Sequence, residues 1–297
     1  MTRNDATPET GLRLERGASM AATLDRAAAM LRAAGIDSAR LDARLIVAAA
    51  TGWTREKLLV EAKAIPDAAA FEAIEAMIDR RVGREPLAQI LQLREFWSLP
   101  FRVTPDVLTP RPESETLVEA VLEWTKQRRP PAAILDLGTG SGCLLLALLH
   151  EFPRATGLGI DRSPAALEVA AANARALGMA GRARFQLGNW TADLQGPFDV
   201  IVANPPYIPA ADIAGLAPEV ARFEPRAALD GGRDGLDAYR TLVPGLRGLL
   251  VPGGLAALEV GAGQADAVSS FAASTGMQPA GHRRDLAGID RVVLIAG

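Results

Sequence analysis

The first part of the chain shows a helical pattern of apolar residues. In AATLDRAAAMLRAAG the side chains of Leu24, Ala27 and Leu31 fall on one face of a helix. The same spacing recurs in SARLDARLIVAAATG and in PDAAAFEAIEAMIDRRVG, each of which ends at a glycine. We therefore predict an all-helical bundle over residues 20–85. Residues 1–19, which are polar and mixed in charge, are expected to form a disordered tail.

Residues 86–112, PLAQILQLREFWSLPFRVTPDVLTPRP, have a different pattern. Alternating apolar residues, aromatic residues and several prolines are typical of a short β-hairpin followed by a linker. We place the boundary between two domains in this segment, so that the second domain covers residues 113–297.

In residues 113–297 short apolar runs alternate with helical patterns. The predicted strands are AAILDL, ATGLGID, ARFQL, FDVIVA, GGLAALEV and RVVLIAG. A helix is predicted between most of them, and the one in GLDAYRTLVPGLRGLL is expected to be interrupted near Pro244. This alternation predicts an α/β fold, with a parallel sheet covered by helices on both faces. Such sheets bind ligands beyond the carboxyl ends of their strands.

The composition narrows the classes of function. Of the 297 residues 49% are hydrophobic and 23% are charged, as in ordinary globular proteins, and no apolar run is long enough to span a membrane. Cys143 is the single cysteine and the two histidines, His150 and His282, stand far apart, so we expect no disulfide and no metal site. A reducing cytoplasm fits these features. The net charge of −3 argues against an enzyme that wraps long nucleic acid.

A glycine-rich loop follows the first strand of the second domain. It begins at Asp136 and contains Gly138, Thr139, Gly140, Ser141 and Gly142. Glycines permit tight turns and a close approach of the backbone to a ligand. A second acid, Asp161, ends the next strand, where a carboxylate accepts hydrogen bonds from ribose hydroxyls.

These features together indicate a ligand with an adenosine part. No G-x-x-x-x-G-K-[ST] motif is present, which favours S-adenosylmethionine over a nucleoside triphosphate. The alternative is a structural turn between strand and helix, in which Asp136 caps or braces the loop. Trp190, after the third strand, is a candidate to flank the adenine, although an isolated tryptophan more often lies in a core.

The run FDVIVANPPY ends a predicted strand in Asn204, Pro205, Pro206 and Tyr207. Two prolines in sequence stiffen the turn and donate no hydrogen bond. The side-chain oxygen of Asn204 and the carbonyl of Pro205 then form a pair of acceptors for the two hydrogens of an –NH₂ group. Tyr207 can pack on a planar amide or base. The alternative is a proline-rich strand exit with Tyr207 in the core.

Such acceptors suit methyl transfer to a poorly nucleophilic nitrogen. An amide lone pair is strongly delocalised, as the C–N rotation barrier of about 18–20 kcal/mol shows. The nitrogen becomes positive as it takes a methyl group, so fixed acceptors hold its N–H groups more strongly in the transition state. The motif therefore predicts a methyltransferase that acts on an amide or aryl amine.

Eight segments resemble the release-factor glutamine methyltransferases, the PrmC or HemK family. They are REFWSLPFRV, LTPRPESETLVE, ILDLGTGSGCLLLALL, GIDRSPAALEVAAANA, NPPYI, EPRAALDGGRDGLDAYR, GGLAALEVGAGQ and DLAGIDRVV. The resemblance implies a small helical domain that holds a release factor, a β-hairpin linker and a Rossmann-like, seven-stranded class I methyltransferase domain. It implies that residues 138–142, Asp161, Trp190 and Asn204 bind S-adenosylmethionine, which leaves as S-adenosylhomocysteine. Asn204–Tyr207 would hold the glutamine of the Gly-Gly-Gln tripeptide in class-one release factors.

Some positions depart from this family's usual pattern. Thr109 and Ser114 stand where isoleucine and threonine are usual, and Asn189 replaces a frequent aspartate. A sister family methylates a glutamine of a ribosomal protein. The segment Pro110-Arg111-Pro112-Glu113 follows the release-factor version, so we expect a release factor as the partner, with no membrane and no direct nucleic-acid contact, and a monomeric enzyme.

Two other functions remain open from the sequence. One is methylation of the exocyclic amine of adenine or guanine in nucleic acid, since such enzymes share the Asn/Asp-Pro-Pro-aromatic loop. The other is a protein that senses S-adenosylmethionine without turnover, although a sensor has no need of paired acceptors for an amine.

Overall fold

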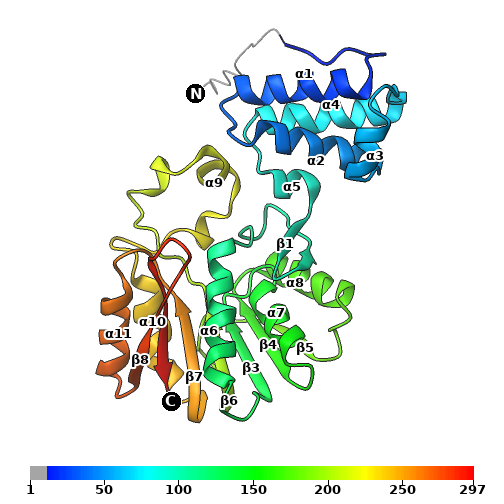
Figure 1. The fold of residues 1–297 in the computed structure, drawn as a ribbon. Coiled ribbons are helices and arrows are strands. Elements are labelled where there is room, and N and C mark those ends of the chain that lie inside the picture. The colour runs from blue at the N-terminus through cyan, green and yellow to red at the C-terminus, as the bar shows by residue number, and fades with distance from the viewer. Residues whose placement is uncertain (1–11) are drawn as a thin grey trace. The chain divides into compact units, whose positions relative to one another are not determined.

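The chain forms two compact units. The computed structural model describes residues 12–297, and these divide between Gln92 and Leu93 (Figure 1). The division falls inside the predicted linker of residues 86–112. Each unit has its own hydrophobic core.

The predicted tail of residues 1–19 is described in part, since residues 1–11 lie outside the described residues. Leu14 is only 8% exposed and packs into the core of the first unit. Ser19 caps the first helix, where its hydroxyl accepts a hydrogen bond from the N–H of Ala22. The prediction of disorder is therefore wrong at Leu14, because this apolar side chain has a core to enter.

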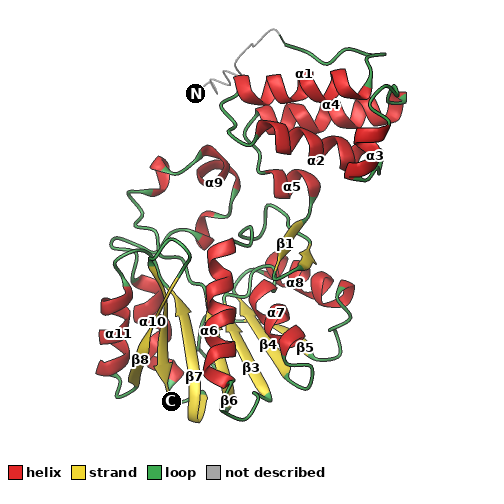
Figure 2. Cartoon of the chain, in the orientation of Figure 1, coloured by secondary structure: helices red, strands yellow, loops and turns green. Residues whose placement is uncertain are grey.

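Within residues 12–92 the chain is helical and contains no strand (Figure 2). The helices there are α1 (Met20–Ala33), α2 (Ala39–Thr51), α3 (Arg55–Val60), α4 (Ala68–Val82) and α5 (Leu87–Leu91). Helices α1, α2 and α4 are the three that the apolar pattern predicted. Buried Asp42 and Arg81 join α2 to α4 through an ion pair of 2.8 Å. The prediction of a hairpin from residue 86 is wrong over α5, because Ile90 is buried in a helical turn.

Within residues 93–297 seven strands form one sheet in the order β5-β4-β3-β6-β7-β9-β8. They are β3 (Ala133–Leu137), β4 (Thr156–Asp161), β5 (Ala183–Leu187), β6 (Phe198–Ala203), β7 (Leu250–Glu259), β8 (Gln278–Arg284) and β9 (Asp290–Ala296). The first five of these pair in parallel. The sheet is parallel as predicted except at one edge, where β9 pairs antiparallel with both β7 and β8. Strand β8 was not predicted.

Helices cover both faces of this sheet (Figure 1). They are α6 (Glu115–Thr125), α7 (Cys143–Glu151), α8 (Pro164–Ala176), α10 (Asp237–Leu246) and α11 (Ala265–Ser274). Successive residues of β6 enter different cores: Val200 packs with α6 and α7, whereas Ile201 packs with α10 and α11. Pro244 lies in the last turn of α10, which ends at Leu246, so the helix stops close to the predicted interruption. No helix in the described part of the chain is long and apolar enough to cross a membrane.

The predicted hairpin is present and belongs to the second unit. Strands β1 (Arg94–Phe96) and β2 (Leu99–Phe101) pair antiparallel around Trp97 and Ser98, which have φ angles of 53° and 57°. Positive φ at both central residues is the geometry that matches the twist of a tight hairpin. Phe96 and Phe101 are buried in the core beneath α6 and α7, with their rings 6.2 Å apart.

Candidate active site

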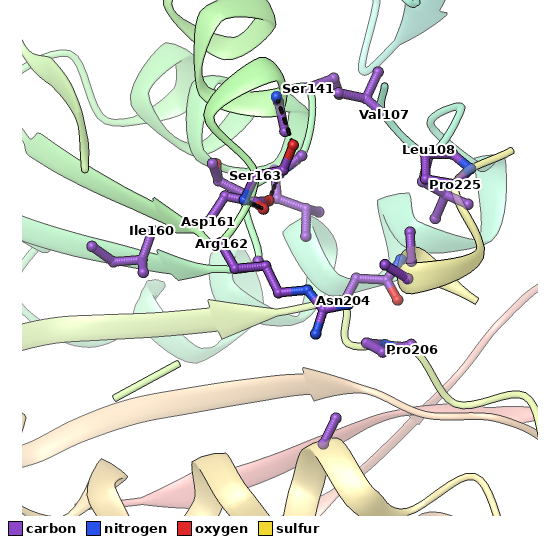
Figure 3. A pocket seen from close by; sticks show the side chains of 18 of the residues that line it. Val107, Leu108, Ser141, Ile160, Asp161, Arg162, Ser163, Asn204, Pro206 and Pro225 are labelled. Atoms are coloured by element: carbon purple, nitrogen blue, oxygen red, sulfur yellow. Dashed lines mark hydrogen bonds between the residues drawn. The ribbon is translucent and has the colours of Figure 1, made fainter. Parts of the chain in front are cut away.

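A cavity of about 370 Å³ lies at the carboxyl edge of the sheet, within the second unit. Its volume is in the usual range for a small-molecule site. Figure 3 shows side chains entering it from the strand ends and from the segments around Val107 and Pro225. The predicted site residues that line it are Gly138, Thr139, Gly140, Ser141, Asp161, Trp190, Asn204 and Pro206. Gly142, Pro205 and Tyr207 do not line it.

The glycine loop needs its glycines for two different reasons. Gly138 has a φ of 73°, and a Cβ there would lie 3.1 Å from the ring of Trp190. The residue therefore leaves room for the indole, which packs over the loop. Gly142 also has a positive φ, of 80°, but a Cβ there would meet Ala170 of α8. Gly142 thus serves the start of α7 and its packing, and not the cavity.

Asp161 braces the loop in addition to lining the cavity. Its Oδ2 accepts a hydrogen bond of 2.9 Å from the N–H of Gly140, and its Oδ1 accepts one of 2.9 Å from the N–H of Ser163. Each carboxylate oxygen has a second lone pair, so both remain able to accept a ligand hydroxyl.

Asp136 is buried directly under the loop. Its Oδ2 accepts a hydrogen bond of 2.6 Å from the Thr139 hydroxyl, as the bracing alternative requires, and within the described residues its Oδ1 has no partner. Burial raises the pKa of Asp136 to about 7, and the nearby carboxylate of Asp161 adds to the shift. A positively charged group in the cavity would lower this pKa, because it would attract the ionised carboxylate. The site therefore suits a cationic ligand.

The Asn-Pro-Pro-Tyr loop leaves β6 beside the glycine loop. Asn204 lines the cavity, and its Nδ2 donates a hydrogen bond of 3.1 Å to the hydroxyl of Ser114. Tyr207 packs against the core formed with α10, and burial raises the pKa of its phenol to about 12. Gln264 donates a hydrogen bond of 3.0 Å to the carbonyl of Tyr207. Tyr207 therefore supports the loop from behind and does not face the cavity, in contrast to the stacking predicted for it.

Sequence reasoning missed Asn173, a buried residue of α8. Its Oδ1 accepts a hydrogen bond from the N–H of Arg102, and its Nδ2 donates to the carbonyls of Arg102 and Ser141. One amide side chain thus ties the exit of the hairpin to the glycine loop. A lone asparagine on the buried face of an amphipathic helix was the available signal.

Two further acids were also missed. Glu224, which follows α9 (Pro218–Phe223), is buried and pairs with Arg111. This pair joins two segments of the cavity wall, those at Pro110 and Pro225. Glu259, the last residue of β7, is 1% exposed, and burial raises its pKa to about 7. An acid at the end of the apolar strand LAALE was the signal for it.

Comparisons with known proteins agree on both units. Residues 22–91 match the family described as the PrmC N-terminal domain, and residues 130–224 match a methyltransferase domain family. A release factor glutamine methyltransferase of Rhodospirillum rubrum is 49% identical over 274 residues, covering 91% of this chain and 83% of that protein. That of Bradyrhizobium diazoefficiens is 44% identical over 298 residues, covering 99% and 98%. Among solved structures, the ribosomal protein L11 methylase from Lactobacillus delbrueckii subsp. bulgaricus aligns with a TM-score of 0.48 at 22% identity, covering 66% of this chain and 84% of that one.

Proposed function

The chain belongs to the release factor glutamine methyltransferase family, and we propose that the cavity at the carboxyl edge of its sheet is where the reaction takes place. The enzyme transfers a methyl group from S-adenosylmethionine to the side-chain amide nitrogen of a glutamine in a release factor. The observation that supports this location is the position of Asn204. Its carboxamide lines the same cavity as the glycine loop, within reach of one small-molecule ligand.

The residues of the loop fit S-adenosylmethionine. The ligand carries a positive sulfonium and a positive amino group, and Asp136, buried beneath the glycine loop, has an Oδ1 without a partner in the described structure. Asp161 presents two carboxylate oxygens to the cavity, as a ribose diol requires. Gly138 and Trp190 would hold the remainder of the adenosine part. When bound, S-adenosylmethionine supplies an electrophilic methyl group.

The chain's own part in the reaction is to hold the substrate nitrogen. Asn204 Oδ1 accepts a hydrogen bond from an N–H group of the glutamine amide, and Pro206 limits the space beside it. The carbonyl of Pro205, which the sequence predicted as a second acceptor, belongs to a residue that does not line the cavity. The bond to Asn204 strengthens as the nitrogen becomes positive, and it contributes about 1.5–3 kcal/mol once it is charge-assisted. No strong base is needed, because the methylated nitrogen is acidic and releases its proton to water.

We extend the proposal to the partner. The glutamine would be that of the Gly-Gly-Gln tripeptide, and the helical unit of residues 20–85 would help to hold the release factor. A match of residues 22–91 to a domain of this family supports a dedicated role for that unit. We propose further that the enzyme acts as a monomer in the cytoplasm, where its substrate works, and without direct contact to nucleic acid.

The test is a methylation assay with isotopically labelled S-adenosylmethionine. One reaction contains the release factor, a second contains a peptide with the Gly-Gly-Gln sequence, and a third contains nucleic acid. We expect the release factor to gain one methyl group, which mass spectrometry locates on the tripeptide glutamine. Label that appears in the nucleic acid alone would refute the proposal.

A further inference from the structure

The side chain of Asn204 is held by a residue of the cavity wall, Ser114. The Nδ2 of Asn204 donates to the hydroxyl of Ser114, which is 2% exposed and lies at the start of α6. An asparagine amide has two nearly isosteric ends, one a donor and the other an acceptor. Which end faces the substrate therefore depends on what the other end meets behind it.

Glu259 lies close to both Asn204 and Ser114. Leu258 of β7 pairs with Ala203 of β6, so Glu259 stands level with Asn204 on the neighbouring strand. Burial has the largest effect on the pKa of its carboxyl group and raises it, whereas the hydroxyls of Ser114 and Tyr207 act to lower it.

Other groups also act on this carboxyl. Arg291 attracts it, whereas Glu113 repels it. The main-chain carbonyl of Glu259 accepts a hydrogen bond of 2.7 Å from the phenol of Tyr239, which fixes the end of the strand. Within the described residues its Oε2 has no hydrogen-bond partner. The carboxyl is therefore held in place, but its burial is incompletely compensated.

The number of hydrogens that Ser114 and Glu259 can donate determines which end of the Asn204 amide meets Ser114. A carboxyl oxygen that carries no proton only accepts hydrogen bonds, and a serine hydroxyl has a single hydrogen to donate. If Ser114 gives that hydrogen to Glu259, its oxygen can only accept, so it meets the NH₂ end of Asn204. The oxygen of Asn204 is then left for the cavity, where a substrate –NH₂ group needs an acceptor.

We propose that Glu259 and Ser114 are positioning residues, which fix the Asn204 carboxamide with its oxygen toward the substrate amide. This inference rests on the proposed role of Asn204 as the acceptor. It also explains why a poorly compensated acid is kept in a core where an apolar residue would cost less. The acid sets the polarity of a relay and does not touch the reacting atoms.

Glu259→Gln tests the relay with little change in shape. The new NH₂ group donates to Ser114, whose hydrogen is then free to turn to Asn204, and the asparagine presents its own NH₂ group to the substrate. We expect kcat to fall about tenfold or more, with the affinity for S-adenosylmethionine close to that of the parent and a melting temperature no lower than the parent's. Ser114→Ala should act in the same way, and Ser114→Thr, which keeps the hydroxyl, should retain activity.

A second substitution separates polarity from packing. Asn204→Asp offers two oxygens, one to accept the hydrogen of Ser114 and one to face the substrate. We expect it to harm the parent, where Glu259 competes for the same hydrogen, and to raise kcat in the Glu259→Gln background. A merely structural role for Glu259 predicts equal effects of Asn204→Asp in both backgrounds.

The outcomes decide between the claims. The positioning proposal is wrong if Glu259→Gln leaves kcat within about twofold of the parent, or if Asn204→Asp acts equally in both backgrounds. If Glu259→Gln does not fold, the comparison of Ser114→Ala with Ser114→Thr decides instead, and equal activities of those two contradict the relay. If Asn204→Ala is fully active, the proposed role of Asn204 as the acceptor for the substrate amide is wrong, whatever the Glu259 and Ser114 variants show.

Discussion

Asn173 should couple the stability of the second unit to cofactor binding. Its side chain makes three hydrogen bonds, with the N–H and C=O of Arg102 and with the C=O of Ser141. Asn173→Ala removes all three and leaves these main-chain groups without their partners. It also leaves a small void at a position that is 1% exposed.

The size of the effect follows from the burial of those groups. A buried polar group without a partner costs about 1–3 kcal/mol, and water can reach the two groups of Arg102 more easily than the carbonyl of Ser141. Taking the low end for each, we expect the free energy of unfolding to fall by about 3 kcal/mol. Because Ser141 lines the cavity, the affinity for S-adenosylmethionine should fall as well.

Urea unfolding and titration calorimetry measure the two effects. The matched control is Asn189→Ala, which truncates an exposed asparagine of the same cavity and should change stability by less than about 0.5 kcal/mol. A loss below about 1 kcal/mol for Asn173→Ala, with cofactor affinity unchanged, would show that this asparagine does not tie the hairpin exit to the loop.

Three further predictions concern charge, backbone and the first unit. Burial raises the pKa of Glu259 from 4.5 to about 7, so its stabilising contribution is complete below 4.5 and is lost as the pH rises through 7. Between those pH values the free energy of unfolding of the parent should fall by about 3 kcal/mol, whereas that of Glu259→Gln should not. Urea midpoints measure both, and an equal fall in the two proteins would contradict this prediction. Gly138→Ala should weaken cofactor binding about tenfold, because the added methyl group crowds Trp190. The control is Gly178→Ala, where φ is 71° and the space is open, and this variant should lower stability only. Equal affinities of the two variants for the cofactor would contradict a role of Gly138 in holding it. Asp42→Ala should destabilise the first unit by about 3 kcal/mol, because it removes the buried partner of Arg81. Amide hydrogen exchange should then become faster in α2 and α4 alone, and unchanged exchange there would contradict the prediction.

The parts of the fold that alternate in hydrophobicity could be predicted from the sequence. Apolar strands such as FDVIVA and the amphipathic helices are recognisable, because the run or spacing of apolar residues shows which side chains are buried. Strand β8 could not be found in this way. Its sequence, QPAGHRR, lies at the sheet edge, is mostly exposed and carries a proline and a glycine. This segment is a strand because its backbone pairs with β9, which its own sequence pattern does not indicate.

The candidate site divides along a similar line. Residues placed at strand ends, such as Asp161 and Asn204, were predicted because topology brings all parallel strand ends to one edge. Ser114, Asn173 and Glu259 were not predicted as site residues, since their surroundings depend on segments that lie far away in the sequence. The direction of a side chain also escapes the pattern, and for this reason Tyr207 was expected in the cavity and packs behind it.

The most direct test of the account is the rate of methyl transfer by Asn204→Ala. The substitution removes the side-chain acceptor that lines the cavity, so kcat on the release factor should fall about tenfold to a hundredfold, while the dissociation constant of S-adenosylmethionine stays near the parent value. A variant that binds the cofactor normally and methylates the glutamine at the parent rate would contradict the claim that Asn204 holds the substrate amide.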